Sequence, residues 1–195
     1  MKCICMSKKV YIISFVFLLF NLLAASIVAS EEKLKPFVLG EISASDELSV
    51  AEARIRQKLQ KNGFEIAGQY RPYKNTQILV ITNSSMRSHA AQSAYGAYGA
   101  VLRVSLTQTK NGIQVSYTNP VYMSHVYRMK TDLAEVSAQL TRALGKKEAY
   151  GSEEGLTKGD LREYQYKWLM PYFTDRHELA DYGNQEAALA AVEKV

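Results

Sequence analysis

An Asn-Gly pair, Asn111 and Gly112, lies between two runs of alternating apolar residues and is the feature of this sequence that most restricts its fold. Asn-Gly at the centre of a two-residue type I′ turn is the strongest short-range signal of a β-hairpin. Such a turn pairs Leu106 with Tyr117, and the alternation assigns the apolar side chains of both strands to one face of a sheet. That face is predicted to carry Leu102, Val104, Leu106, Ile113, Val115 and Tyr117, and the opposite face Arg103, Ser105, Thr107, Gln114 and Ser116.

The chain from residue 36 onward alternates between strand and helix patterns. Pro72 is expected to break one strand, and the apolar run 78–81 is typical of a strand covered on both faces. Strands broken by isolated helices indicate the α+β class, with a mixed or antiparallel sheet, helices packed on one face and a helical C-terminal extension. Strands are predicted over 36–42, 64–73 and 78–81, a loop over 94–100, and helices over 49–62, 84–92, 133–144, 157–168 and 188–195.

Two of these helices have capping-box spacing at their starts. Ser49 is followed by Glu52, and Thr157 by Asp160, each three residues later. In a capping box the hydroxyl side chain accepts a hydrogen bond from the third backbone N–H of the helix, and the acidic side chain reaches back. Both pairs are therefore predicted to start helices.

The first thirty residues have the order of a secretory signal peptide. Lysines precede an uncharged apolar run from Val10 to Ala29, and small residues precede a cleavage site between Ser30 and Glu31. The length of the run leaves an uncleaved signal anchor as the alternative. Both interpretations place the rest of the chain across the membrane, so we expect a periplasmic or secreted protein that touches the membrane only through this segment.

Residues 31–195 are expected to form a single α+β domain, with a core over about 37–150 and a helical extension over 151–195. Cys3 and Cys5 precede the apolar run, so the domain contains no cysteine for a disulfide, a zinc-thiolate site or a nucleophile. The formal charge of +5 includes three lysines of the N-terminal segment, which leaves the domain close to neutral. This balance does not favour binding to nucleic acid.

Two motifs resemble secreted members of the domain-of-unknown-function family 302. They are Tyr-Thr-Asn-Pro-Val-Tyr at 117–122 and Met-Pro-Tyr-Phe at 170–173. The helix that ends at Asn62 and Gly63, the strand 78–81 and the helix 133–145 are also similar to that family's core, over roughly residues 40–150. The resemblance implies a small α+β fold and carries over no catalytic residue, because the family has no settled activity.

Tyrosines gather in three segments, 95–98, 117–127 and 164–172. Tyrosine has an apolar ring and a polar hydroxyl, so these segments would line a groove for a small amphipathic ligand or an extended peptide if they converged. The alternative is that the rings fill the interface between sheet and helices, with their hydroxyls at its rim. The candidate ligand-binding residues are Tyr95, Tyr98, Asn119, Tyr122 and Tyr172.

A second candidate site consists of methionines near a histidine. Thioether and imidazole groups suit copper(I), whereas methionine also fills gaps in ordinary cores. The candidate metal ligands are Met123, His125, Met129 and Met170. His177 and Glu178 begin a zinc-protease pattern, but Asp181 stands where the second histidine belongs.

The sequence thus predicts an exported protein of unknown biochemical activity, a non-catalytic binding or accessory module for a small molecule or an exported protein, without a cofactor. The alternative is a periplasmic copper- or haem-handling protein that uses His125 and the nearby methionines. An enzyme is the least supported interpretation, since no nucleophile and base are recognisable as a pair.

Overall fold

The predicted hairpin lies at the centre of the sheet in this computed structural model, which describes residues 31–43, 47–172, 175 and 177–194. Its strands are β4 (Leu102–Thr109) and β5 (Gly112–Thr118), which pair antiparallel. Both faces were predicted correctly, since the side chains assigned to the apolar face are all buried.

The register of the hairpin differs from the prediction by two residues. Leu106 lies opposite Val115 rather than Tyr117, because Lys110 and Asn111 occupy the turn. A type I′ turn needs positive φ at both central residues. Here the positive φ falls on Gly112, at 111°. A shift of two leaves every side chain on its predicted face, because the side chains alternate with a period of two.

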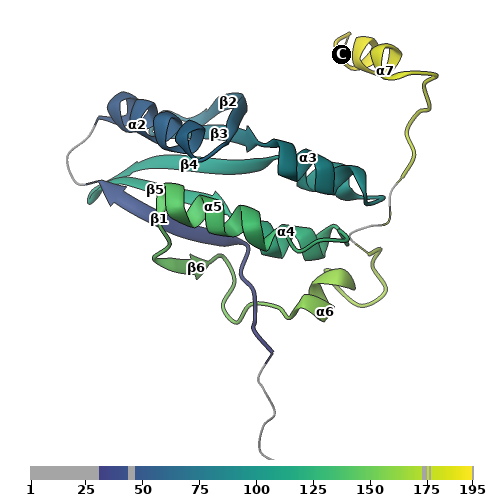
Figure 1. Cartoon of the computed structure of the whole chain (residues 1–195). Helices are drawn as coiled ribbons and strands as arrows, with labels where there is room; N and C mark the ends of the chain where they lie inside the picture. The colour runs from purple at the N-terminus through teal and green to yellow at the C-terminus, as the bar shows by residue number, and fades with distance from the viewer. Residues whose placement is uncertain (1–30, 44–46, 173–174, 176, 195) are drawn as a thin grey trace, which may run out of the picture. The chain divides into compact units, whose positions relative to one another are not determined.

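Six strands form one sheet in the order β2-β3-β4-β5-β1-β6, and every neighbouring pair is antiparallel (Figure 1). This confirms the α+β class, with the antiparallel form of the sheet. The short strand β6 was not predicted, because three residues are too few to show alternation. The remaining strands are β1 (Phe37–Ser43), β2 (Glu65–Tyr73), β3 (Thr76–Thr82) and β6 (Glu148–Tyr150).

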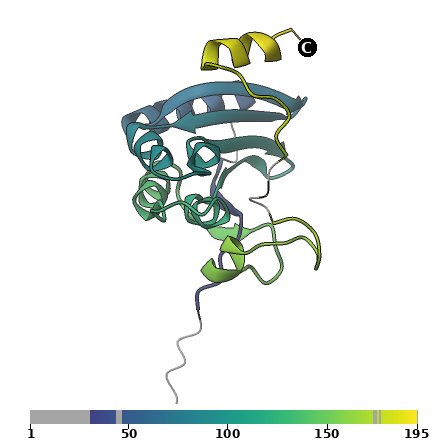
Figure 2. The same cartoon turned by 90° about the vertical axis from the view of Figure 1, so that its right-hand side faces the viewer.

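The described helices cover one face of this sheet, and none of them lies on the other face, as Figure 2 shows. The main core lies between the two layers and includes Ile55, Leu79, Val104 and Leu140, all fully buried. The helices are α2 (Leu48–Lys61), α3 (Ser84–Ala91), α4 (Pro120–Val126), α5 (Ala134–Leu144), α6 (Lys158–Arg162) and α7 (Gln185–Val192), with a 3-10 helix, η1 (Gly96–Gly99).

The start of α2 differs from the prediction. Its N-cap is Glu47, without a side-chain cap, and Glu52 accepts hydrogen bonds from Arg56 at 2.9 and 2.8 Å instead of reaching back. The predicted capping box at Ser49 is therefore wrong.

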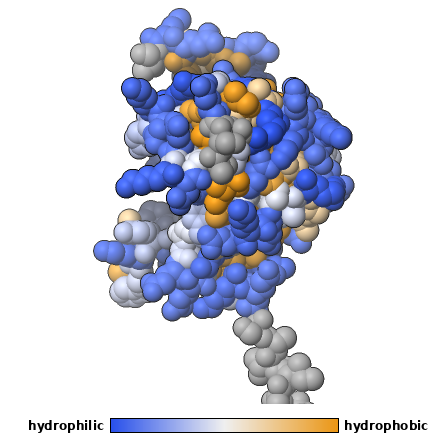
Figure 3. Space-filling view, turned by 90° about the vertical axis from the view of Figure 1, so that its left-hand side faces the viewer, coloured by the Kyte–Doolittle hydropathy of each residue, from blue (hydrophilic) through white to orange (hydrophobic). Residues whose placement is uncertain are grey.

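Figure 3 views the molecule from the end where β1 stops and α2 starts, and apolar side chains reach the surface there among hydrophilic ones.

The capping box at Thr157 is confirmed at the start of α6. The Asp160 amide donates to the Thr157 hydroxyl at 3.1 Å, and the Thr157 amide donates to the Asp160 carboxylate at 3.2 Å. The helix ends at Arg162, however, and is shorter than predicted. Leu161 of this helix packs with Leu34 and Val126 in a second, smaller cluster.

Pro72 does not end β2, which continues to Tyr73. Proline lacks the N–H that a central strand needs, but β2 is an edge strand, and the register shifts between Tyr70 and Tyr73. Edge position therefore explains why the strand continues past Pro72, with only a local irregularity in its pairing at the proline.

The C-terminal part of the chain packs little. None of the described residues of α7 is buried. Among the described residues, every helix falls short of the length and apolarity that crossing a bilayer requires. The apolar run from Val10 to Ala29, predicted to be a signal peptide or anchor, lies outside the described residues.

Candidate functional site

The face of the sheet without helices carries apolar side chains where an exposed face is usually polar. Ile78 and Val80 are only half-buried on this face, although the apolar run 78–81 predicted a strand covered on both sides. Phe37 and Tyr70 are exposed there to 43% and 45%. The sheet therefore presents a second apolar surface that the described helices do not cover.

A hollow of about 270 Å³ lies on this surface. Tyr70 of β2 stands at one side of it, and the rings of Phe37 and Tyr150 stand together at the other, with centroids 5.7 Å apart. The strands between them carry small hydroxyl side chains, so the surface dips between aromatic walls. The hollow is lined by Phe37, Tyr70, Ile78, Arg103, Ser105, Ser116, Tyr117, Thr118 and Tyr150.

A second hollow, of about 310 Å³, adjoins the first and shares Tyr70, Arg103 and Thr118 with it. Its other end is formed by Tyr98 of η1 and Tyr127, whose rings stack with centroids 5.3 Å apart. We call the two hollows together the sheet groove. The second hollow is lined by Tyr70, Val80, Tyr98, Val101, Leu102, Arg103, Thr118, Met123 and Tyr127.

Arg103 lies where the two hollows meet. It is exposed on β4, opposite Val80, and the Thr118 hydroxyl donates to its backbone oxygen at 3.3 Å. Among the described residues, no carboxylate pairs with its guanidinium and no group accepts a hydrogen bond from it. Burial raises the pKa of the Tyr127 hydroxyl, and the charge of Arg103 acts in the opposite direction. The groove therefore holds one uncompensated positive charge.

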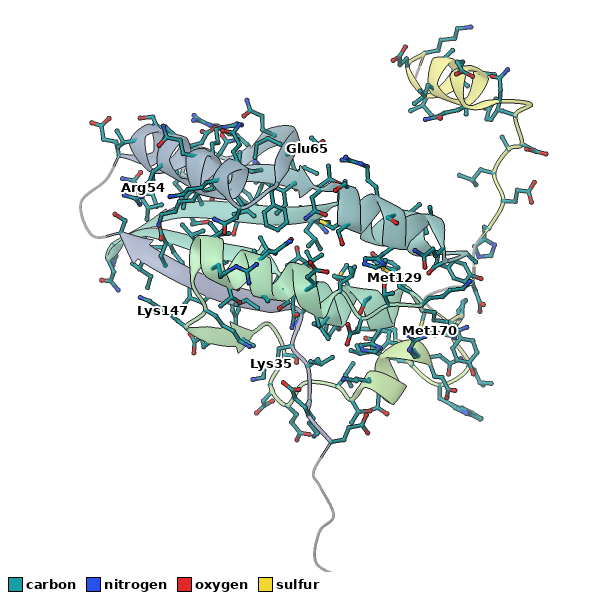
Figure 4. The ribbon with its side chains drawn as sticks, in the orientation of Figure 1. Lys35, Arg54, Glu65, Met129, Lys147 and Met170 are labelled. Carbon is teal, nitrogen blue, oxygen red and sulfur yellow. The ribbon has the colours of Figure 1, made fainter. Side chains whose placement is uncertain are left out.

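Of the predicted ligand-binding residues, Tyr98 lines the groove and Asn119 has a structural role. The Asn119 carboxamide oxygen accepts from the backbone amide of Val121 at 3.1 Å, which caps α4. Its amide nitrogen donates to the carbonyl of Lys35 at 2.9 Å. Lys35 lies just before β1 (Figure 4). The oxygen and the nitrogen of the carboxamide thus both bind backbone groups, and they connect the segment before β1 to the start of α4.

The other three predicted residues lie outside the lining of the groove. Tyr95 is half-buried before η1, and its carbonyl accepts from the Tyr98 amide at 3.3 Å. Tyr122 packs against the small cluster that includes Leu161 of α6. Tyr172 is 42% exposed, with the guanidinium carbon of Arg128 5.7 Å from its ring centroid. Phe173, in one of the motifs that resemble the family, lies outside the described residues.

The candidate metal ligands occupy different environments. Met123 lines the groove, Met129 is fully buried, and Met170 is 44% exposed in the segment after α6 (Figure 4). The His125 imidazole is buried, and its Nδ1 accepts from Arg162 Nε at 3.2 Å. Within the described part of the chain, no group of three or more His, Cys, Asp or Glu side chains could hold a metal ion. The metal site stays a prediction.

The environment of His125 predicts that the stability of the protein depends on pH. Burial lowers the pKa of its imidazole, the positive charges of Arg162 and Lys158 lower the pKa further, and Asp132 opposes them. The unfolded chain, in which histidine has a pKa of about 6.5, therefore takes up a proton that the folded protein does not. Stability is full above this value and falls as the pH drops towards the lower pKa of the folded state.

We expect His125→Gln to lose less unfolding free energy than the wild type between about pH 7.5 and 5.5, measured by urea denaturation. His177→Gln, which changes an exposed histidine, is the control and should retain the wild-type dependence. Equal pH dependence in His125→Gln and the wild type would contradict the assignment.

The similarity of this chain to known proteins is distant. No protein-family model matches the chain, and no curated protein matches it. Among solved structures, the chain is similar to the crystal structure of the uncharacterized conserved protein DUF302 from Bacillus stearothermophilus. The TM-score is 0.46 and the sequence identity 14%, over 55% of this chain and 93% of that chain. By its name, this neighbour belongs to the family that the motifs at 117–122 and 170–173 resemble.

Proposed function

We propose that this protein is a non-catalytic binding module and that its small-molecule ligand lies in the sheet groove. The observation that carries the proposal is the open sheet face, where aromatic side chains border strands with small hydroxyl residues. Each hollow is close to the lower end of the range for small-molecule sites, roughly 300–1,000 Å³. Apolar walls with a few polar groups are the usual composition of such sites.

The aromatic walls supply the main source of affinity. Phe37 and Tyr70 keep more than two fifths of their surface exposed, so a bound ligand would remove apolar area from water on both sides. Each Å² removed contributes roughly 25 cal/mol. The Ser105 hydroxyl donates to the Ser116 carbonyl at 3.4 Å, so between the walls the hydroxyl oxygen remains available as an acceptor. This arrangement suits a flat, largely apolar ligand.

Tyr70 allows a direct test because a second tyrosine on the same strand lies outside the groove. We expect the wild type to bind the neutral dye Nile red saturably, with one dye per chain. Tyr70→Ala should weaken this binding about tenfold, because it removes an aromatic wall of both hollows. Fluorescence titration measures the affinity.

Tyr73→Ala is the matched control. Tyr73 is also on β2, is 71% exposed and lines neither hollow, so its removal should leave the affinity within about twofold. Absence of saturable binding, or equal weakening by both substitutions, would overturn the proposal.

A further inference from the structure

We infer that the ligand of the sheet groove is an aromatic or similarly flat apolar carboxylate whose acidic group pairs with Arg103. This inference rests on the proposed function and adds the chemical class of the ligand. Arg103 is the group that decides it, because it lines both hollows and lies where they meet.

The charge of the groove favours an anion. Among the described residues that line the two hollows there is no Asp or Glu, while Arg103 contributes a full positive charge. Some cations of the surface are paired with carboxylates: Arg87 donates to both carboxylate oxygens of Glu65 at 3.0 Å, and Lys33 donates to Glu154 at 3.1 Å. Arg103 has no acidic partner among the described residues and lines hollows with aromatic walls, so an anionic ligand bound there can pair with it.

The neighbouring hydroxyl groups leave Arg103 as the strong donor of the groove. The Thr118 and Ser105 hydroxyls donate their protons to the backbone carbonyls of Arg103 and Ser116, at 3.3 and 3.4 Å. Their oxygens can accept from a ligand, but they have no second proton to give. A guanidinium presents a planar fork of donors that matches the two oxygens of a carboxylate.

The aromatic side chains at the ends of the groove indicate the chemistry of the rest of the ligand. Phe37 and Tyr150 on one side and Tyr98 and Tyr127 on the other offer rings against which a flat apolar body can pack. A carboxylate held at Arg103 places such a body in either hollow. The combination of a central cation and aromatic ends thus specifies an amphipathic acid.

Two isosteric probes separate charge from shape. 2-Naphthoate and 2-naphthamide share the same ring system and differ in charge, and each can be titrated against bound Nile red at neutral pH. We expect the wild type to bind naphthoate at least about tenfold more tightly than naphthamide. Salt should weaken naphthoate binding and leave naphthamide binding nearly unchanged.

In Arg103→Gln this preference should fall to about twofold or less, with the affinity for Nile red and naphthamide retained. Arg103→Lys, which keeps the charge and loses the planar fork, should retain part of the preference. Arg142→Gln removes another exposed arginine, on α5, and should behave as the wild type.

The outcomes distinguish the two proposals. Nile red and naphthamide could bind in a Tyr70-dependent manner while naphthoate binds no more tightly than naphthamide, with or without Arg103. In that case the ligand is not an anion and the inference is wrong, but the groove remains a binding site. If none of the three probes binds saturably, the proposed function itself is wrong.

Discussion

Leu140→Ala is expected to lower the free energy of unfolding by about 2–5 kcal/mol, the largest effect among our predictions. Leu140 lies on the buried face of α5, is fully buried and belongs to the main core between the helices and the sheet. Its truncation removes apolar contacts and leaves a cavity that fixed strands and helices cannot close. Urea denaturation followed by circular dichroism measures the loss.

The matched control for this change is Leu189→Ala in α7. Leu189 is also helical but is 54% exposed, and none of the described residues of its helix is buried. Both substitutions alter helix propensity equally, so the difference between them reports burial. We expect Leu189→Ala to change stability by no more than about 0.5 kcal/mol. A loss as large as that of Leu140→Ala would show that α7 packs against the domain.

Gly96→Ala should destabilise the protein by about 1–3 kcal/mol, the second largest effect. A Cβ at residue 96 would lie 2.1 Å from the backbone oxygen of Ala90, and a backbone atom cannot move aside as a flexible side chain can. The helix η1 would have to move away from the end of α3. Thermal or urea denaturation would detect the change.

Gly159→Ala in α6 supplies the control for the glycine. Its added Cβ would lie 3.8 Å from the Thr157 hydroxyl oxygen, an ordinary contact, and alanine favours helix over glycine by up to about 1 kcal/mol. Gly159→Ala should therefore be neutral or stabilising. Equal destabilisation by the two alanines would contradict the close approach at Gly96.

Local patterns in the sequence were sufficient for much of the fold. Leu133, Val136, Leu140 and Leu144 recur at helical spacing, and the structure buries all four. The hairpin faces followed from alternation alone. The strand β6 was missed because the contact that makes it a strand is distant in sequence, namely its pairing with β1. The loop predicted over 94–100 contains η1, where glycine is required at residue 96 because the backbone approaches Ala90 of α3 closely.

The candidate site was less accessible to sequence analysis. Arg103 was assigned correctly to the polar face of its strand, but the pattern could not show which face the helices would leave open. Tyr70 and Phe37 carry no motif, and only the sheet order brings them to opposite sides of one groove. Asn119 was predicted to bind a ligand, and the structure shows its carboxamide joined to backbone groups from two segments. Export of the chain stays a prediction.

Pro72 in the outermost strand also affects how one molecule meets another. A free strand edge offers N–H and C=O groups on which a strand from a second molecule can grow, and this is a common route to aggregation. Proline lacks the donor that such growth requires, and at the opposite edge β6 spans only three residues. Both margins of the sheet are thus poor templates for cross-molecule strand addition. The apolar sheet face can therefore stay exposed to solvent while neither edge of the sheet favours the addition of a strand from a second copy of the chain.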